Sequence, residues 1–260
     1  MDIITYDGSM EGLLSAVFEV YEYKIPDPVI CVRSAANGSL FGQFHEVHSN
    51  TEKTNRVYKK LSERLSKTSM LQVYSTFLSG LPGMENILLR YIQYVLASKQ
   101  SVEYDYSHPD VLFVQQTSKK VHREKHRMEA FIRFQVTQDQ LYYAIIQPDF
   151  NVLPLINNHF RRRYADQRWL IYDSHRKYGL YYDLETVTEI EMNFDIDVKH
   201  TKSVATLNDT NEELYQKLWQ QYFSSVNIAA RKNMKLHIQH MPKRYWRFLT
   251  EKQVQFNEEF

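Results

Sequence analysis

In the first fifty residues, apolar and polar positions alternate with two periodicities, one typical of strands and one typical of helices. The run "IITYDG" at 3–8 begins apolar and ends at Asp7-Gly8, which predicts a short strand followed by a turn. From Ser9 to Tyr21, apolar residues recur every three or four positions, which predicts a helix with Ser9 as its N-terminal cap. Pro26 and Pro28 are expected to end it. The run "SLFGQFHEVHS" at 39–49 alternates and predicts an edge strand.

Residues 51–127 keep the period of helices. Thr51 is expected to cap the first helix, "GLPGM" at 80–84 is expected to be a turn, and Pro109 is expected to open the last helix. The apolar stripes of these predicted helices are Val57, Leu61 and Leu65; Leu71, Tyr74, Phe77 and Leu78; Ile87, Leu88, Tyr91, Ile92 and Val95; and Val111, Val114 and Val121.

The period changes to that of strands in residues 128–192. "AFIRFQV" and "LYYAIIQ", joined by the polar "TQDQ", predict one hairpin. "RWLIYD" and "YGLYYD" predict a second hairpin, which "VTEIEMN" extends. Between the hairpins, 152–164 predict a short helix. Further on, Thr210 and Glu213 have the spacing of a capping box and predict a helix over 209–227.

These elements predict an α+β fold: an antiparallel sheet from the middle of the chain, packed by helices from the N- and C-terminal parts. We expect a single domain over 1–252, helical over about 51–127 and sheet-rich over about 128–192, with a tail at 253–260. Strands and helices do not alternate regularly, so a doubly wound parallel sheet is not expected. The predicted core residues are Tyr6, Leu13, Val17, Phe18, Phe131, Phe134, Ile145, Leu170, Ile171, Leu218 and Phe223.

The number of cysteines and the hydropathy of the chain exclude several classes of protein. The single cysteine, Cys31, excludes an internal disulfide and a self-contained cysteine-ligated iron–sulfur cluster. The chain shows neither a signal-peptide pattern nor an apolar run long enough to cross a bilayer. We therefore expect a cytoplasmic protein with no membrane partner.

The net charge of +1 conceals strong segregation. Residues 118–177 carry twelve basic side chains against six acidic ones, and 229–252 carry seven against one. Between them, 183–213 carry two basic side chains against nine acidic ones. If the two basic segments fold side by side, they form a face for a polyanion. The alternative is that each basic run is simply solvated.

Common catalytic signatures are absent from the sequence: it has no phosphate loop, no G-x-G-x-x-G and no H-E-x-x-H. In "VHREKHRMEAFIRF", His122 and His126 lie four residues apart, and Glu129 follows within a turn. That spacing suits metal ligands, but the flanking Arg123 and Lys125 oppose a cation, so phosphate contact or plain hydrogen bonding is favoured. We expect no metal and no other cofactor.

Two further stretches combine basic and aromatic residues. "PDFNVLPLINNHFRRRYADQRWLIYD" contains His159, Arg162, Arg163 and Tyr164; its Asp149 is either a helix cap or an acid/base group. Tyr164 or Trp169 could stack on a base, although Trp169 fits a core strand better. "VNIAARKNMKLHIQHMPKRYW" has the mixture typical of nucleic-acid surfaces; its candidates are Asn227, Arg231, His237, His240, Arg244 and Tyr245.

Together with "YDGSMEGLLSAVFEVY" and "YGLYYD", these stretches resemble an uncharacterised bacterial family assigned to DNA metabolism or DNA repair. The resemblance covers residues 2–252. It implies DNA as one partner and a radical-SAM protein of DNA-modification role, encoded nearby, as another. The same domain is found elsewhere fused ahead of a uracil-DNA-glycosylase-like domain.

Three hypotheses follow. The first is a DNA-binding accessory module that grips phosphates with basic side chains: Arg123, Lys125, Arg162, Arg163, Arg231 and Arg244. The second is an enzyme acting on nucleic acid, in which acid/base groups or metal ligands converge: His122, His126, Glu129, Asp149, and His237 or His240. The third is a scaffold that serves only the radical-SAM partner. The sequence favours the first and leaves catalytic activity open.

Overall fold

The computed structural model describes residues 2–35, 43–138, 140–191 and 238–252. The chain divides into two compact units, residues 1–122 (unit 1) and 123–260 (unit 2). Helix α5 (Pro109–Phe131) begins in unit 1 and ends in unit 2. The expectation of a single domain over 1–252 stays a prediction.

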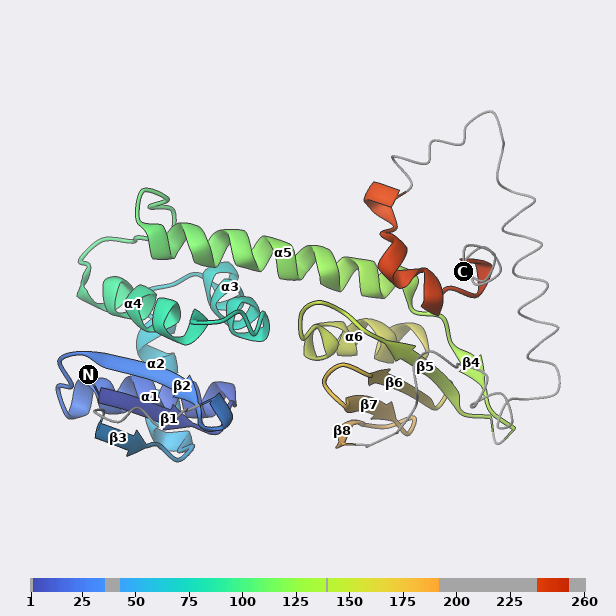
Figure 1. Cartoon of the computed structure of the whole chain (residues 1–260), viewed down its shortest axis with the longest axis horizontal. Helices are drawn as coiled ribbons and strands as arrows, with labels where there is room; N and C mark the ends of the chain where they lie inside the picture. The colour runs from blue at the N-terminus through green and yellow to red at the C-terminus, as the bar shows by residue number, and fades with distance from the viewer. Residues whose placement is uncertain (1, 36–42, 139, 192–237, 253–260) are drawn as a thin grey trace. The chain divides into compact units, whose positions relative to one another are not determined.

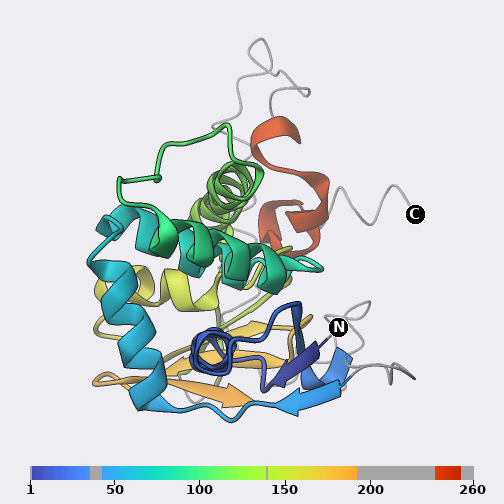
Figure 2. The same cartoon turned by 90° about the vertical axis from the view of Figure 1, so that its left-hand side faces the viewer.

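Unit 1 contains a three-stranded parallel sheet with the order β2-β1-β3. Its strands are β1 (Asp2–Tyr6), β2 (Pro28–Val32) and β3 (Gln43–Glu46), and helix α1 (Met10–Glu22) connects the first two. Ser9 caps α1 by accepting from the amide of Gly12, as predicted. Figure 2 shows α1 nearly end-on beside the strands. The predicted edge strand is confirmed as β3, whereas β2, an apolar run between two prolines, had not been predicted.

Helices α2 (Thr51–Ser62), α3 (Lys67–Leu78) and α4 (Met84–Ala97) complete unit 1 with the first half of α5. The cap of α2 is Asn50 rather than the predicted Thr51, whose hydroxyl donates to Glu11 instead. Val111, Val114 and Val121 are buried as predicted, but Leu71 is 42% exposed. Asn86 of α4 satisfies both backbone groups of Ile30, which closes part of the free edge of β2.

Unit 2 contains a five-stranded sheet in chain order, β4-β5-β6-β7-β8 (Figure 1). The strands are β4 (Gln135–Val136), β5 (Tyr142–Ile146), β6 (Trp169–Asp173), β7 (Tyr178–Tyr182) and β8 (Val187–Glu191). Both predicted hairpins are present, and β8 extends the second. The sheet is mixed rather than antiparallel, because β5 and β6 run parallel. Helix α6 (Leu153–Arg163) connects them, and a connection of that length lets the second strand start from the same end as the first.

The first predicted strand of unit 2 is much shorter than expected. Residues up to Phe131 continue α5, and only Gln135 and Val136 pair with β5. The buried face of α5 continues through Met128, which explains why the helix persists into the strand-like run. After β8, the described chain resumes at residue 238 and includes η4, a 3₁₀ helix (Lys243–Phe248).

The α+β class is confirmed, and the core predictions hold in part. Tyr6, Leu13, Val17 and Ile171 are buried. Five others are only half-buried: Phe18, Phe131, Phe134, Ile145 and Leu170. Leu218 and Phe223, with the helix predicted over 209–227, lie outside the described residues. Within the ranges that the structure describes, no helix is both long and apolar enough to traverse a membrane.

Candidate functional site

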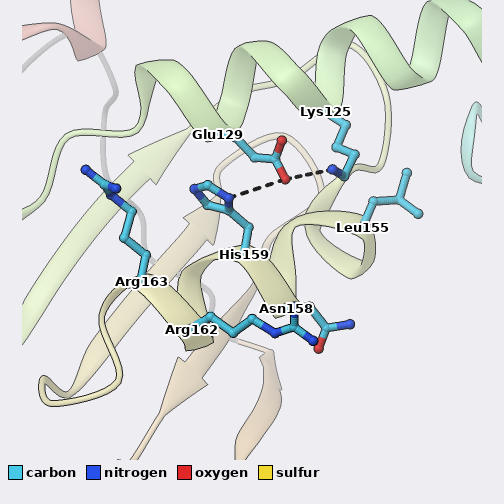
Figure 3. A pocket seen from close by; sticks show the side chains of 7 residues that line it. All are labelled: Lys125, Glu129, Leu155, Asn158, His159, Arg162 and Arg163. Atoms are coloured by element: carbon cyan, nitrogen blue, oxygen red, sulfur yellow. Dashed lines mark hydrogen bonds and ion pairs between the residues drawn. The ribbon is translucent and has the colours of Figure 1, made fainter.

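A pocket opens between the last half of α5 and the exposed face of α6, within unit 2 (Figure 3). Its volume is about 430 Å³. The residues that line it are Lys125, Glu129, Leu155, Asn158, His159, Arg162 and Arg163. Three of the seven are permanent cations and one is a carboxylate, so the pocket is basic with a single acidic group.

Helical spacing explains what each wall presents. Lys125 and Glu129 are four residues apart on α5 and share a face. On α6, the lining residues follow the same rule, because Leu155, Asn158 and Arg162 are three to four residues apart. The opposite face of α6 is buried against the sheet through Leu153, Ile156 and Phe160. The polar face of a half-buried helix therefore forms one wall of the pocket.

The Glu129 carboxylate holds the centre of the pocket. Its side chain is 13% exposed, and its Oε1 accepts from Lys125 Nζ at 2.7 Å. His159 Nδ1 lies 3.8 Å from the same oxygen, and His126 Nδ1 lies 4.0 Å from Oε2. Figure 3 shows Glu129 directed toward Lys125 and His159. The two imidazoles are too far away for hydrogen bonds, so the carboxylate keeps acceptor capacity.

Arg162 and Arg163 are exposed in the last turn of α6. Among the described residues, Arg162 has no ion pair or hydrogen-bond partner, and the Arg163 guanidinium lies 5.9 Å from the centre of the Tyr164 ring. Tyr164 is half-buried and packs on Phe134 and Phe160. Tyr164 therefore contacts Arg163 through its ring, and its packing on Phe134 and Phe160 leaves little of the ring face for a stacked base. Trp169, the other stacking candidate, is fully buried in the core.

Arg123 and His122 do not line this pocket. At 3.6 residues per turn, Arg123 lies about 120° around α5 from Glu129, which turns it away from α6. Both Arg123 and His122 are exposed, and His126 has 87% of its side chain exposed at the margin near Glu129. The basic residues of the opening stretch are thus divided between two faces of one helix.

A second polar cluster lies on the buried side of α5. Glu124 is 1% exposed and accepts from the Tyr245 hydroxyl, with 2.5 Å to Oε1 and 2.6 Å to Oε2. Arg244 Nη2 lies 3.1 Å from Oε2, and the backbone amide of Asp149 donates to Oε1 at 3.0 Å. Arg127 also lies 3.6 Å from the carboxylate. Burial, with the hydrogen bond to Glu124, raises the pKa of Tyr245.

This cluster contains three of the candidate residues. Tyr245 is 2% exposed, so its ring is packed inside the unit and is not a stacking surface. Arg244 is occupied by Glu124 and by Asp149, whose Oδ2 lies 2.8 Å from Nη2. Asp149 is not a helix cap either, because the cap position of α6 is Val152. These groups fasten residues 243–248 to α5 and to the loop before α6.

The 148–151 loop is fixed by a further buried carboxylate. Asp173 is fully buried at the end of β6 and accepts from the amides of His175 and Arg176. The Arg176 guanidinium pairs with Asp173 and donates to the carbonyls of Pro148 and Asp149. Asp173 and Arg176 therefore have a structural role: their contacts fix the loop that leads from β5 into α6.

Residues 82–251 match a family described as a domain of unknown function, DUF4130. The chain belongs to this family. No curated protein matches the chain. The DUF4130 match covers α4, α5 and all the described elements of unit 2, and it leaves out the parallel sheet of unit 1 with α1 to α3. The pocket and the Glu124 cluster both lie inside the DUF4130 region.

The remaining candidates are separated from the pocket or lie outside the description. His240 is exposed near the start of the segment 238–252. Asn227, Arg231 and His237 fall outside the described residues. In the part of this DUF4130 member that the structure describes, no three His, Cys, Asp or Glu side chains are grouped to hold a metal ion.

Sequence reasoning had not singled out Glu124 as a site residue, although a signal was present. Val121, Glu124 and Met128 follow the spacing of the buried face of α5, so an acidic residue stood on an apolar stripe. A carboxylate at such a position requires buried donors. Asn158 had no comparable signal, because only the packing of α6 against the sheet places it in the pocket wall.

Proposed function

We propose that this protein is a nucleic-acid-binding accessory module whose pocket between α5 and α6 receives a backbone phosphate. One observation carries the proposal: Lys125, Arg162 and Arg163 line one pocket, and Arg162 has no acidic partner among the described residues. Arginine offers the planar donor fork that suits phosphate oxygens. The pocket thus supplies both charge and directed donors to a polyanion.

The principal alternative is that these arginines only stabilise α6. Cations in the last turn of a helix interact favourably with its dipole, typically by about 0.3–1 kcal/mol each. Arg161 meets this description, because it is exposed and its Nη2 donates to the Glu185 carbonyl. Arg162 and Arg163 differ from it because they also line the pocket.

The sequence resemblance supports the wider biological setting. It points to DNA metabolism or repair, and to a radical-SAM protein as the partner that carries the chemistry. With one cysteine, the chain lacks the thiolates for a cluster of its own, so a division of work between the two proteins is consistent with its composition. We place this activity in the cytoplasm.

The test is the salt dependence of DNA binding. Fluorescence anisotropy with a short labelled strand should give a straight line of log affinity against log salt. Arg162→Ala should weaken binding to any sequence and flatten the slope by about 0.7–0.9, because one fewer phosphate contact is made. Arg161→Ala is the matched control, since Arg161 is a neighbouring exposed arginine that does not line the pocket.

The slope separates the two explanations. An accessory module predicts a smaller slope for Arg162→Ala and an unchanged slope for Arg161→Ala. Equal, small effects of both substitutions would show that the arginines act only on the helix, and the proposal would then fail. Binding that is absent in the wild-type protein at low salt would leave the scaffold hypothesis ahead.

A second candidate function is an enzyme, favoured by the position of Glu129 between two imidazoles. His126 and His159 lie 4.0 and 3.8 Å from its two oxygens, so a carboxylate and two titratable rings share one pocket margin. Elemental analysis of the purified protein tests the metal-dependent form. About one zinc or iron per chain, lost on His126→Ala, would promote the enzyme over the accessory module.

A further inference from the structure

A carboxylate inside a phosphate-binding pocket requires an explanation. The negative charge of Glu129 weakens the attraction of the pocket for a phosphate, although its side chain is only 13% exposed. A pocket that served a phosphate alone would gain from a neutral residue at this position. An occupant that brings hydrogen-bond donors as well as a phosphate gives the carboxylate a purpose.

The free acceptor positions of Glu129 define those donors. Lys125 Nζ occupies one site on Oε1 at 2.7 Å, and the two imidazole nitrogens stand beyond hydrogen-bonding distance. An ionised carboxylate has about four acceptor sites, so each oxygen can still accept one N–H. The Lys125 ammonium retains donors next to the carboxylate. The pair therefore presents two adjacent acceptors, the carboxylate oxygens of Glu129, with a cationic donor, the Lys125 ammonium, next to them.

Among the standard bases, guanine has the complementary edge. Its N1–H and N2–H are two adjacent donors, and its O6 is an acceptor next to them. Adenine and cytosine each offer one donor on this edge, and thymine offers one donor between two acceptors. Only guanine can place one N–H on each oxygen of Glu129 and its O6 toward Lys125.

The rest of the pocket suits the remainder of a nucleotide. Leu155 gives an apolar wall and His159 a ring that is 37% exposed, while the Arg162 side chain extends toward Asn158 and supplies donors for a phosphate (Figure 3). The volume of about 430 Å³ lies within the usual range of small-molecule sites. The guanine edge that would meet Glu129 is available only when the base is unpaired.

We propose that the α5–α6 pocket recognises an unpaired guanine in a nucleic-acid strand through Glu129 and Lys125. This inference rests on the proposed function and adds the identity of the recognised base. A merely structural role for Glu129, as the ion-pair partner that joins α5 to His159 of α6, predicts no preference among bases.

The experiment compares short oligothymidine strands that carry one central guanine, hypoxanthine or thymine. Guanine should bind roughly 5- to 150-fold more tightly than thymine, the range for one bidentate contact. Hypoxanthine lacks the N2 amino group and should fall between them. Glu129→Gln has the same shape but one acceptor fewer; it should abolish the guanine preference and leave affinity for plain oligothymidine equal or higher, because a negative charge is removed.

Two further variants complete the design. Lys125→Met should reduce the guanine preference, which keeps the test valid if Glu129→Gln fails to fold. Arg162→Ala with Arg163→Ala should weaken every strand but keep the ratio between guanine and thymine. Equal thermal unfolding of each variant and the wild type confirms that binding is what changed.

The outcomes separate this inference from the proposed function. Strands that bind in a salt-dependent way but without a difference among guanine, hypoxanthine and thymine overturn the guanine inference and leave the proposed function standing. Free deoxyguanosine monophosphate that binds as tightly as the strand supports guanine recognition and overturns the accessory-module function. Binding of neither overturns both.

Discussion

Removing the Glu124 carboxylate should destabilise the protein more than removing any surface carboxylate. In the wild type, this buried group accepts from Tyr245, from Arg244 and from the Asp149 amide. Glu124→Ala leaves Arg244 and Arg127 without their buried partner and the Asp149 amide without its acceptor. Breaking a buried ion pair by deleting one member typically costs about 3–5 kcal/mol.

The magnitude can be cross-checked from the single contacts. Hydrogen bonds to a charged group contribute about 1.5–3 kcal/mol each. Tyr245→Phe removes the one that its hydroxyl donates to Glu124, while Arg244, which also donates to that hydroxyl, keeps Glu124 and Asp149 as partners. We therefore expect Tyr245→Phe to cost about 1.5–3 kcal/mol and Glu124→Ala to cost more. Urea unfolding followed by circular dichroism gives both values. Glu185→Ala, which removes an exposed carboxylate of unit 2, is the control and should stay within about 0.5 kcal/mol of the wild type.

A local measurement tests the same reasoning independently. Glu124 holds η4, which contains Lys243, Arg244 and Arg247 as trypsin sites. Loosening this segment should speed cleavage there in Glu124→Ala, because proteolysis follows local opening. If Glu124→Ala unfolds at the same urea concentration as Glu185→Ala, and trypsin cuts both at the same rate, the cluster does not hold η4 and the reasoning is refuted.

Two further predictions concern pH and a close backbone contact. Burial alone would raise the pKa of Glu19, but hydrogen bonds from Lys53 and His45 outweigh it and hold this pKa below the ordinary 4.5. The folded protein therefore binds a proton at Glu19 less readily than the unfolded chain, so the stability that Glu19 contributes is present above pH 4.5 and is lost as the pH falls below it. Glu19→Gln should lower the stability at pH 7 and reduce the loss of stability in acid. An unchanged dependence of the melting temperature on acidic pH would contradict this. At Gly179, an added Cβ would lie 2.8 Å from the Ile171 carbonyl oxygen, so Gly179→Ala should cost about 1–3 kcal/mol in urea unfolding, and an unchanged unfolding midpoint would contradict this.

The local sequence determined the elements whose signals lie within one or two turns. Ser9 caps α1 and Pro109 opens α5, because capping and ring constraints act on neighbouring backbone groups. The hairpin of β6 and β7 followed from two apolar runs around a polar turn. In the site, the i, i+4 pairing of Lys125 with Glu129 and the position of Arg162 and Arg163 on one helix were readable in the same way.

Only the tertiary structure decided which of these groups meet. The parallel pairing of β5 with β6 depends on where α6 returns the chain, and no local pattern carries that information. In the tertiary structure, Glu124, Arg244 and Tyr245 form one hydrogen-bonded cluster on the buried side of α5, although the sequence around them is typical of a basic, aromatic surface. The tertiary structure also turned Arg123 away from α6 and brought His159 to Glu129. The physical reason is that helical spacing fixes which residues share a face, whereas the partner of that face is chosen by packing between distant parts of the chain.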